Sequence, residues 1–141
     1  MNATVIPING QSGWLGELLS KFPLAKFSPL AYYDKHLDCI RVIIRECSVT
    51  EHRLTAVMTV LEDNYPDDGQ QPYVGFVIKG VQHLFESMNL PLDGVMRVTD
   101  LFHRIATTCP DQLVDSVLAP YQSLLQVLQE TELEVDFAEA A

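Results

Sequence analysis

The apolar run Tyr73–Ile78 constrains the fold of this chain more than any other stretch. It is short, rich in aromatic and β-branched residues, and contains Gly75, and this composition predicts a β-strand. A lone strand leaves its backbone N–H and C=O groups unpaired, so it needs neighbouring strands. The nearest candidates are two earlier apolar runs, Cys39–Ile44 and Leu54–Leu61.

Together the three runs predict a small antiparallel three-stranded meander over about residues 38–79. Strict alternation would place one set of side chains on the core face: Ile40, Val42, Ile44, Leu54, Ala56, Met58, Val60, Val74, Phe76 and Ile78. The opposite face mixes charged side chains such as Arg41 and Lys79 with Ile43 and Val57. Such a face is either partly exposed to solvent or covered by another chain.

The second of these runs also fits a helical pattern. Leu54, Val57, Met58 and Leu61 follow the spacing of one helix face, and Ser48–Glu51 resembles a capping box. A helical hairpin over residues 37–61, in a mostly α-helical fold, is therefore the alternative to the meander.

Four or five helices are expected to pack against the sheet, which makes the fold class α+β. Apolar stripes predict helices over Val81–Met88, Gly94–Thr108 and Leu113–Leu128, the last with a kink or junction at Pro120. A short helix is also expected around Trp14. Residues 1–141 are predicted to form one domain, in which residues 1–11 and 131–141 are mobile.

The charge and composition narrow the range of functions. The 141 residues carry 19 acidic and nine basic side chains, for a net charge of −10, so direct nucleic-acid binding is not expected. No run approaches 18 apolar residues, the N-terminus lacks a basic region, and the three cysteines form no disulfide framework. We therefore expect a cytoplasmic protein without a membrane segment.

One polar motif has the residue types of a metal site. In the sequence Asp34-Lys-His-Leu-Asp38, alternation on an extended chain would place Asp34, His36 and Asp38 on one side. Carboxylate oxygen and imidazole nitrogen are ordinary metal ligands. These three residues are the candidate metal ligands, and a small metal-dependent enzyme centred on them is one functional hypothesis.

A second motif has the features of a partner-binding anchor. Trp14, Leu18 and Phe22 are spaced by four, so they would form one stripe on a short helix that ends at Pro23. A bulky apolar stripe of this kind can pack on the core or insert into a groove of a partner protein. These three residues are the candidate partner-binding residues.

The sequence contains no phosphate-binding loop, no zinc-type cysteine pair and no nucleophile elbow, so no catalytic residue and no cofactor is predicted. The leading hypothesis is a non-enzymatic adaptor, regulator or inhibitor that binds a protein partner or associates with itself. Besides the metal-dependent enzyme, an acidic mimic of nucleic acid is an alternative.

Overall fold

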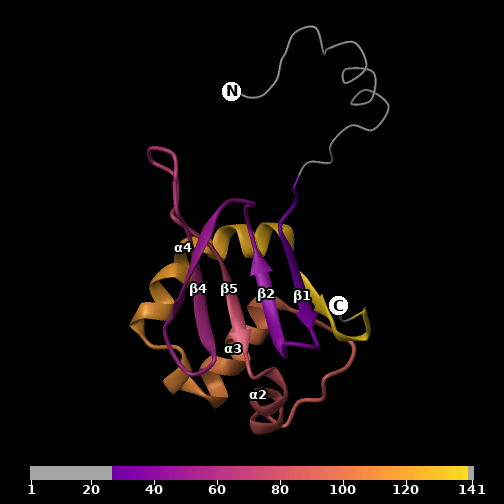
Figure 1. Ribbon diagram of the computed structural model, residues 1–141. Helices are drawn as coiled ribbons and strands as arrows, with labels where there is room; N and C mark the ends of the chain where they lie inside the picture. The colour runs from indigo at the N-terminus through magenta and orange to yellow at the C-terminus, as the bar shows by residue number, and fades with distance from the viewer. Residues whose placement is uncertain (1–26, 140–141) are drawn as a thin grey trace, which may run out of the picture.

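The computed structural model describes residues 27–139 and has an α+β fold (Figure 1). A five-stranded antiparallel sheet, a two-stranded sheet and three α-helices make up this part of the chain. The strands are β1 (Leu30–Asp34), β2 (Cys39–Ile43), β3 (Val49–Arg53), β4 (Met58–Asp63), β5 (Tyr73–Lys79), β6 (Val95–Arg97) and β7 (Glu134–Asp136). The helices are α2 (Val81–Ser87), α3 (Val98–Thr108) and α4 (Asp115–Thr131), with 3-10 turns at Pro110–Gln112 and Phe137–Glu139.

The order of the strands differs from the predicted meander. In the sheet the order is β1-β2-β5-β4-β3, so β5 lies between the two runs that were expected to be neighbours. Five of its seven residues are buried, on both faces of the sheet, and this double burial is available only to a central strand. The helical alternative for residues 37–61 is wrong, because this region forms β2, β3 and most of β4.

Both edge strands were missed by the sequence prediction. Strand β3 begins inside the proposed capping box Ser48–Glu51, and its last four residues, Thr50–Arg53, are exposed and polar. Strand β1 precedes the first predicted run and pairs with β2 through a tight hairpin. The polar, exposed residues of β3 lack the apolar alternation on which the prediction depended.

A β-bulge changes which side chains of β5 lie on each face of the sheet. Leu61 pairs with Gly75, whereas Glu62 pairs with Tyr73, so the intervening Val74 is an extra residue. The predicted core positions Ile40, Val42, Met58, Val60, Phe76 and Ile78 are confirmed as one cluster. Val74 was assigned to this cluster wrongly, because the bulge turns it into a second cluster on the other face.

Helices cover one face of the five-stranded sheet, with α3 and α4 behind the strands in Figure 1. Phe76 of β5 packs against Phe102 of α3 with ring centroids 5.2 Å apart, and Phe102 stacks on Tyr121 of α4 at 4.2 Å. Helix α4 confirms the C-terminal stripe and runs through Pro120 as one element. Helix α3 starts at Val98 rather than Gly94, because Val95–Arg97 is used by strand β6.

The segment after Thr131, which its acidity predicted to be mobile, is described as far as residue 139. It forms β7, which pairs with β6 and lies beside β1. Val135 is fully buried, and the Phe137 ring contacts Tyr33 and Phe85 with centroids 5.5 Å and 5.2 Å away. Pairing with β6 and these two buried apolar side chains attach the segment to the core. The expectation for residues 1–11 lies outside the described residues.

Gly75 is required by the close approach of β2. A Cβ atom at this position would lie 2.0 Å from the backbone oxygen of Val42, which is far below van der Waals contact. We expect Gly75→Ala to lower the free energy of unfolding by about 2–3 kcal/mol, because β2 must move away. Urea denaturation followed by circular dichroism measures this loss.

Gly69→Ala is the matched control. Its φ of 75° is unfavourable for alanine, but an added Cβ would meet nothing within 4 Å, so we expect a loss of about 1 kcal/mol. Equal losses for the two variants would contradict the proposed role of the close approach.

Candidate binding face

The five-stranded sheet has a second face that carries its own small core. We call it the open face, because its cluster contains no residue from a helix. Its floor consists of the buried residues Cys39, Leu61, Val74 and Val77, with Ile43, Cys47 and Val49 partly buried around them. This is the face that the sequence predicted to be partly exposed to solvent or covered by another chain.

Charged side chains lie across this apolar floor. Glu51 of β3 approaches Arg41 of β2 at 3.9 Å and Lys79 of β5 at 3.7 Å. Strands β2 and β3 are three strand spacings apart, about 14 Å in a flat sheet. The long side chains therefore reach over β4 and β5 and shield the floor from water. Arg41 and Lys79 share this carboxylate, and Asp34 of β1 lies in the same row of the sheet as Cys39 and Lys79.

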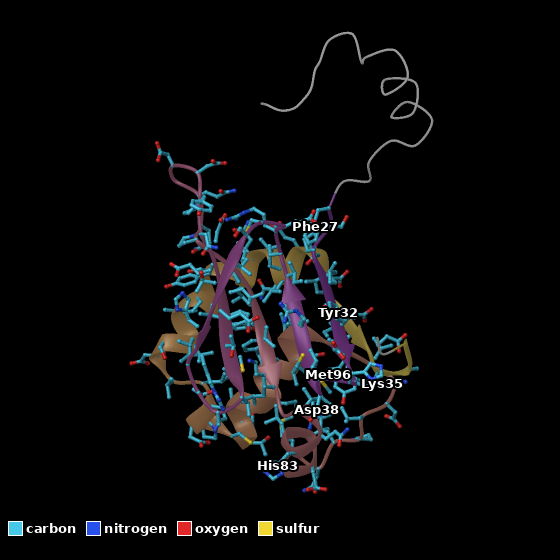
Figure 2. The ribbon with its side chains drawn as sticks, viewed as in Figure 1. Phe27, Tyr32, Lys35, Asp38, His83 and Met96 are labelled. Atoms are coloured by element: carbon cyan, nitrogen blue, oxygen red, sulfur yellow. The ribbon has the colours of Figure 1, made fainter. Side chains whose placement is uncertain are left out.

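The open face has two hollows of about 260 Å³ each. The Leu37 hollow is next to the β1–β2 hairpin, and its lining residues are Leu37, Cys39, Arg41, Glu51, Val77 and Lys79. The Phe27 hollow is lined by Phe27, Arg41, Ile43, Arg45, Glu46, Cys47, Val49 and Leu61. Phe27 and the hairpin residue Asp38 lie at opposite ends of the sheet in Figure 2.

Apolar side chains are exposed around this face. Leu37 is 71% exposed, and Leu30 and Phe27 are also exposed. Leu30 pairs with Ile43 in the β1–β2 ladder, so both side chains lie on the same side of the sheet. Exposed leucine and phenylalanine beside a hollow with an apolar floor are features of a surface that contacts another protein segment.

The Arg45–Asp63 ion pair closes one end of the open face. The Arg45 guanidinium donates to Asp63 Oδ2 at 2.7 Å and to the Gln71 carbonyl oxygen at 2.9 Å. Asp63 Oδ1 accepts a hydrogen bond from the Tyr65 N–H at 2.9 Å. The Arg45 hydrogen bond, followed by that from Tyr65, lowers the pKa of Asp63 below its ordinary value.

The two thiols of the open face are not arranged as nucleophiles. Burial is the main factor that raises the pKa of Cys39, and the charge of Asp34 adds to it. Burial, followed by the charge of Asp63, likewise raises the pKa of Cys47. Both side chains therefore remain protonated near neutral pH, and the thiol form is a poor nucleophile.

The predicted metal ligands Asp34 and Asp38 use their carboxylates inside the fold. Asp34 Oδ1 accepts from the N–H groups of His36 and Leu37 at 2.9 Å and 3.1 Å, which closes the turn between β1 and β2. Asp38 Oδ1 accepts from the Tyr33 hydroxyl at 2.8 Å and from the Gln82 N–H at 3.1 Å. Asp38 therefore joins the hairpin to the start of α2.

His36 is exposed in the same turn. Within residues 27–139, no group of three or more His, Cys, Asp or Glu side chains is arranged to hold a metal ion. The metal site remains a prediction supported by sequence spacing. The other predicted set, Trp14, Leu18 and Phe22, lies outside the described residues.

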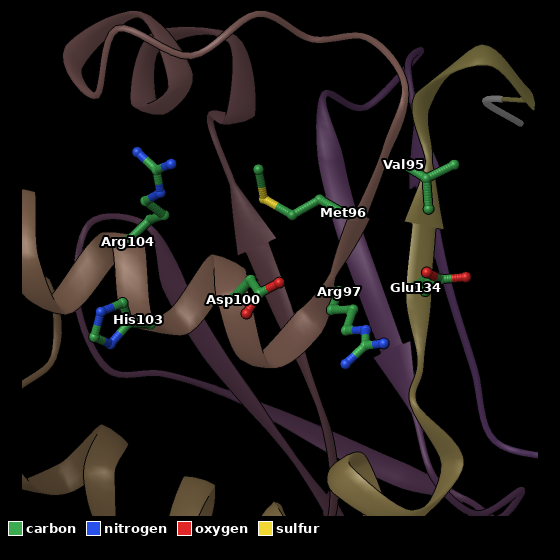
Figure 3. Close-up of a pocket in the computed structure, with 7 residues that line it drawn as sticks. All are labelled: Val95, Met96, Arg97, Asp100, His103, Arg104 and Glu134. Carbon is green, nitrogen blue, oxygen red and sulfur yellow. The ribbon is translucent and has the colours of Figure 1, made fainter.

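A larger cavity of about 490 Å³ lies between α3 and the β6–β7 ribbon (Figure 3). Its lining carries both signs of charge: Val95, Met96, Arg97, Asp100, His103, Arg104 and Glu134. All of these residues except Met96 are exposed, so water screens their charges and leaves little binding energy to the cavity. The sequence could not predict this cavity, because it depends on the pairing of Arg97 with Glu134 across the ribbon.

The lowered pKa of Asp63 predicts a pH dependence of stability. A carboxylate whose folded pKa lies below its unfolded value of about 3.8 stabilises the fold above that value and loses the effect as pH falls. The stability margin is the free energy of unfolding of the natural chain minus that of the Asp63→Asn variant. We expect this margin to be constant above about pH 5 and to decrease below about pH 4. Urea denaturation at a series of pH values measures this margin.

Asp68→Asn is the control, because Asp68 is exposed in the loop before β5 and forms no ion pair among the described residues. A margin over Asp63→Asn that stays constant through the acidic range would show that the Arg45 contact does not stabilise the folded state.

No helix within the described residues is long and apolar enough to cross a bilayer. Comparisons of the chain with models of protein families, with curated proteins and with solved structures find no match.

Proposed function

We propose that this chain is a non-enzymatic protein-binding module, acting as an adaptor, regulator or inhibitor, and that the open face is its contact surface. The observation that carries the proposal is the exposure of Leu37, which is 71% exposed, and of Phe27 and Leu30 beside a face without helix cover. Burial of such apolar surface is the main source of affinity in protein association.

The charges of the open face favour a particular kind of partner surface. Arg41 and Lys79 share the single carboxylate of Glu51, and Arg45 is already paired with Asp63. A partner that places one carboxylate beside apolar side chains would approach the cation pair and cover the exposed apolar side chains. This composition describes an amphipathic protein segment with an acidic flank.

A polyanionic partner such as nucleic acid fits less well. The chain has a net charge of −10, so its long-range field repels phosphates even though the open face has local cations. The exposed Leu37 and the apolar floor would also gain nothing from a sugar–phosphate backbone.

Site-specific photo-crosslinking in cells tests the proposed surface. A photoreactive amino acid replaces Leu37, which lines the open face, or Tyr65, which is 82% exposed in the loop between β4 and β5. We expect a discrete crosslinked protein from position 37 and none from position 65. The charge reversal Arg41→Glu should remove most of the product from position 37.

Two results would contradict the proposal. Identical crosslinking patterns from positions 37 and 65 would show that contacts at the open face are nonspecific. A product from position 37 that withstands Arg41→Glu would show that the charges of the open face do not select the partner.

A further inference from the structure

We infer that two copies of this chain associate through strand β3, which pairs antiparallel with β3 of the second copy across a two-fold axis. The two five-stranded sheets then form one continuous sheet. The inference goes beyond the proposed function, because it concerns an edge of the sheet rather than the open face. It holds or fails independently of any partner at that face.

Strand β3 is the open edge of the five-stranded sheet. The opposite edge strand, β1, lies beside β7, whereas β3 is paired with β4 and with no other described strand. The Asn64 N–H donates to the Ser48 carbonyl oxygen at 2.9 Å, and this bond fixes the alternation of the β3–β4 ladder. The N–H and C=O groups of Val49, Glu51 and Arg53 therefore point away from β4, toward the edge.

Two-fold symmetry lets these backbone groups pair in a register that also pairs charges. Residues whose backbone groups face the edge must lie opposite one another, so Glu51 meets Val49, Glu51 or Arg53 of the second copy. With Glu51 on the axis, two carboxylates lie directly opposite each other, which destabilises a ladder. With His52 on the axis, Glu51 lies opposite Arg53 in both directions. The two attractive pairs favour this register over the pairing of Glu51 with Val49.

Glu51 and Arg53 are able to make this contact, since both are exposed. The Glu51 carboxylate lies 3.9 Å from the Arg41 guanidinium and 3.7 Å from the Lys79 ammonium. Both distances exceed that of a hydrogen bond, so the carboxylate can still accept one. Nε and one terminal nitrogen of Arg53 donate to carbonyl oxygens of the turn before β4, at 3.3 Å and 3.1 Å. The other terminal nitrogen remains available as a donor.

The surface next to β3 lacks the charges that would keep two copies apart. Each chain has a net charge of −10, so two copies repel each other unless their contact avoids unbalanced acidic side chains. Helix α4 has no charged residue between Asp115 and Glu130. Ser116 and Ala119 of this stretch line a hollow of about 350 Å³ together with His52 of β3. The uncharged part of α4 therefore borders the edge.

This pattern of charge favours a second copy over a different protein as the occupant. At the edge itself Glu51 and Arg53 have opposite signs, and behind it the Glu62 carboxylate is hydrogen-bonded to His52 at 2.7 Å. A different protein would gain affinity by complementing the acidic surface of the chain, whereas a copy needs a neutral and self-complementary contact. Charged side chains on an edge also exclude unrelated strands.

Disulfide trapping tests the pairing in the full chain. Residues on the axis form a pair without hydrogen bonds, with Cα atoms about 4.5 Å apart, which a disulfide can span. His52→Cys in a chain that also carries Cys47→Ser and Cys109→Ser should therefore form a covalent dimer in a glutathione buffer at high protein concentration. Cys39 is buried and stays unchanged.

Thr50→Cys and His83→Cys in the same background are the controls. In the inferred register the two Thr50 positions are about 14 Å apart along the strands, too far for a disulfide. His83 is exposed on α2 and reports random collisions. We expect a covalent dimer from position 52 and none from positions 50 and 83. Equal yields from position 52 and either control, or no dimer from position 52, would overturn the inference.

Charge reversal followed by mixing separates pairing from a loss of fold. Glu51→Arg or Arg53→Glu, each added to the His52→Cys chain, places like charges opposite each other in both pairs. Each variant alone should form about tenfold less covalent dimer. A mixture of the two variants restores both attractive pairs between unlike chains, so a covalent heterodimer should form. A mixture that forms no more dimer than the separate variants would contradict the pairing of Glu51 with Arg53.

Discussion

The burial of β5 on both of its faces is the constraint on which the rest of this structure depends. Phe76 and Ile78 enter the core beneath the helices, whereas Val74 and Val77 enter the small cluster of the open face. A strand with two apolar faces must be central and must have a layer on each side. On the helix side, α3 and α4 provide that layer. On the other side, the side chains of Arg41, Glu51 and Lys79 lie across the floor, and no helix among the described residues covers it.

The sequence predicts those parts of the fold whose residues follow one clear period. The strand at Tyr73–Lys79 and the helical stripes of α2 and α4 are confirmed, because local alternation or helical spacing is enough to identify them. Strands β6 and β7 are three residues each and join positions 37 or more residues apart, so no local pattern reveals them. The bulge at Val74 depends on the partner strand and is equally hidden from the sequence.

The candidate site shows the same limits. The mixed composition around Arg41, Ile43 and Lys79 predicts a face that is wet or covered, but it does not reveal that Glu51 reaches both cations across the sheet. The residues with the most suggestive chemistry, Asp34 and Asp38, instead fix the hairpin and the start of α2 through hydrogen bonds. Their spacing reflects a tight turn as much as it suggests a ligand set.

The central position of β5 between β2 and β4 therefore holds the two layers of the fold together. The most direct measurement is hydrogen exchange at the backbone amides of the natural chain. The account predicts that the β5 amides exchange among the slowest in the sheet, because β5 is paired on both sides and five of its seven residues are buried. Exchange of the β5 amides as fast as that of the amides of edge strand β3, whose last four residues are exposed, would contradict the account.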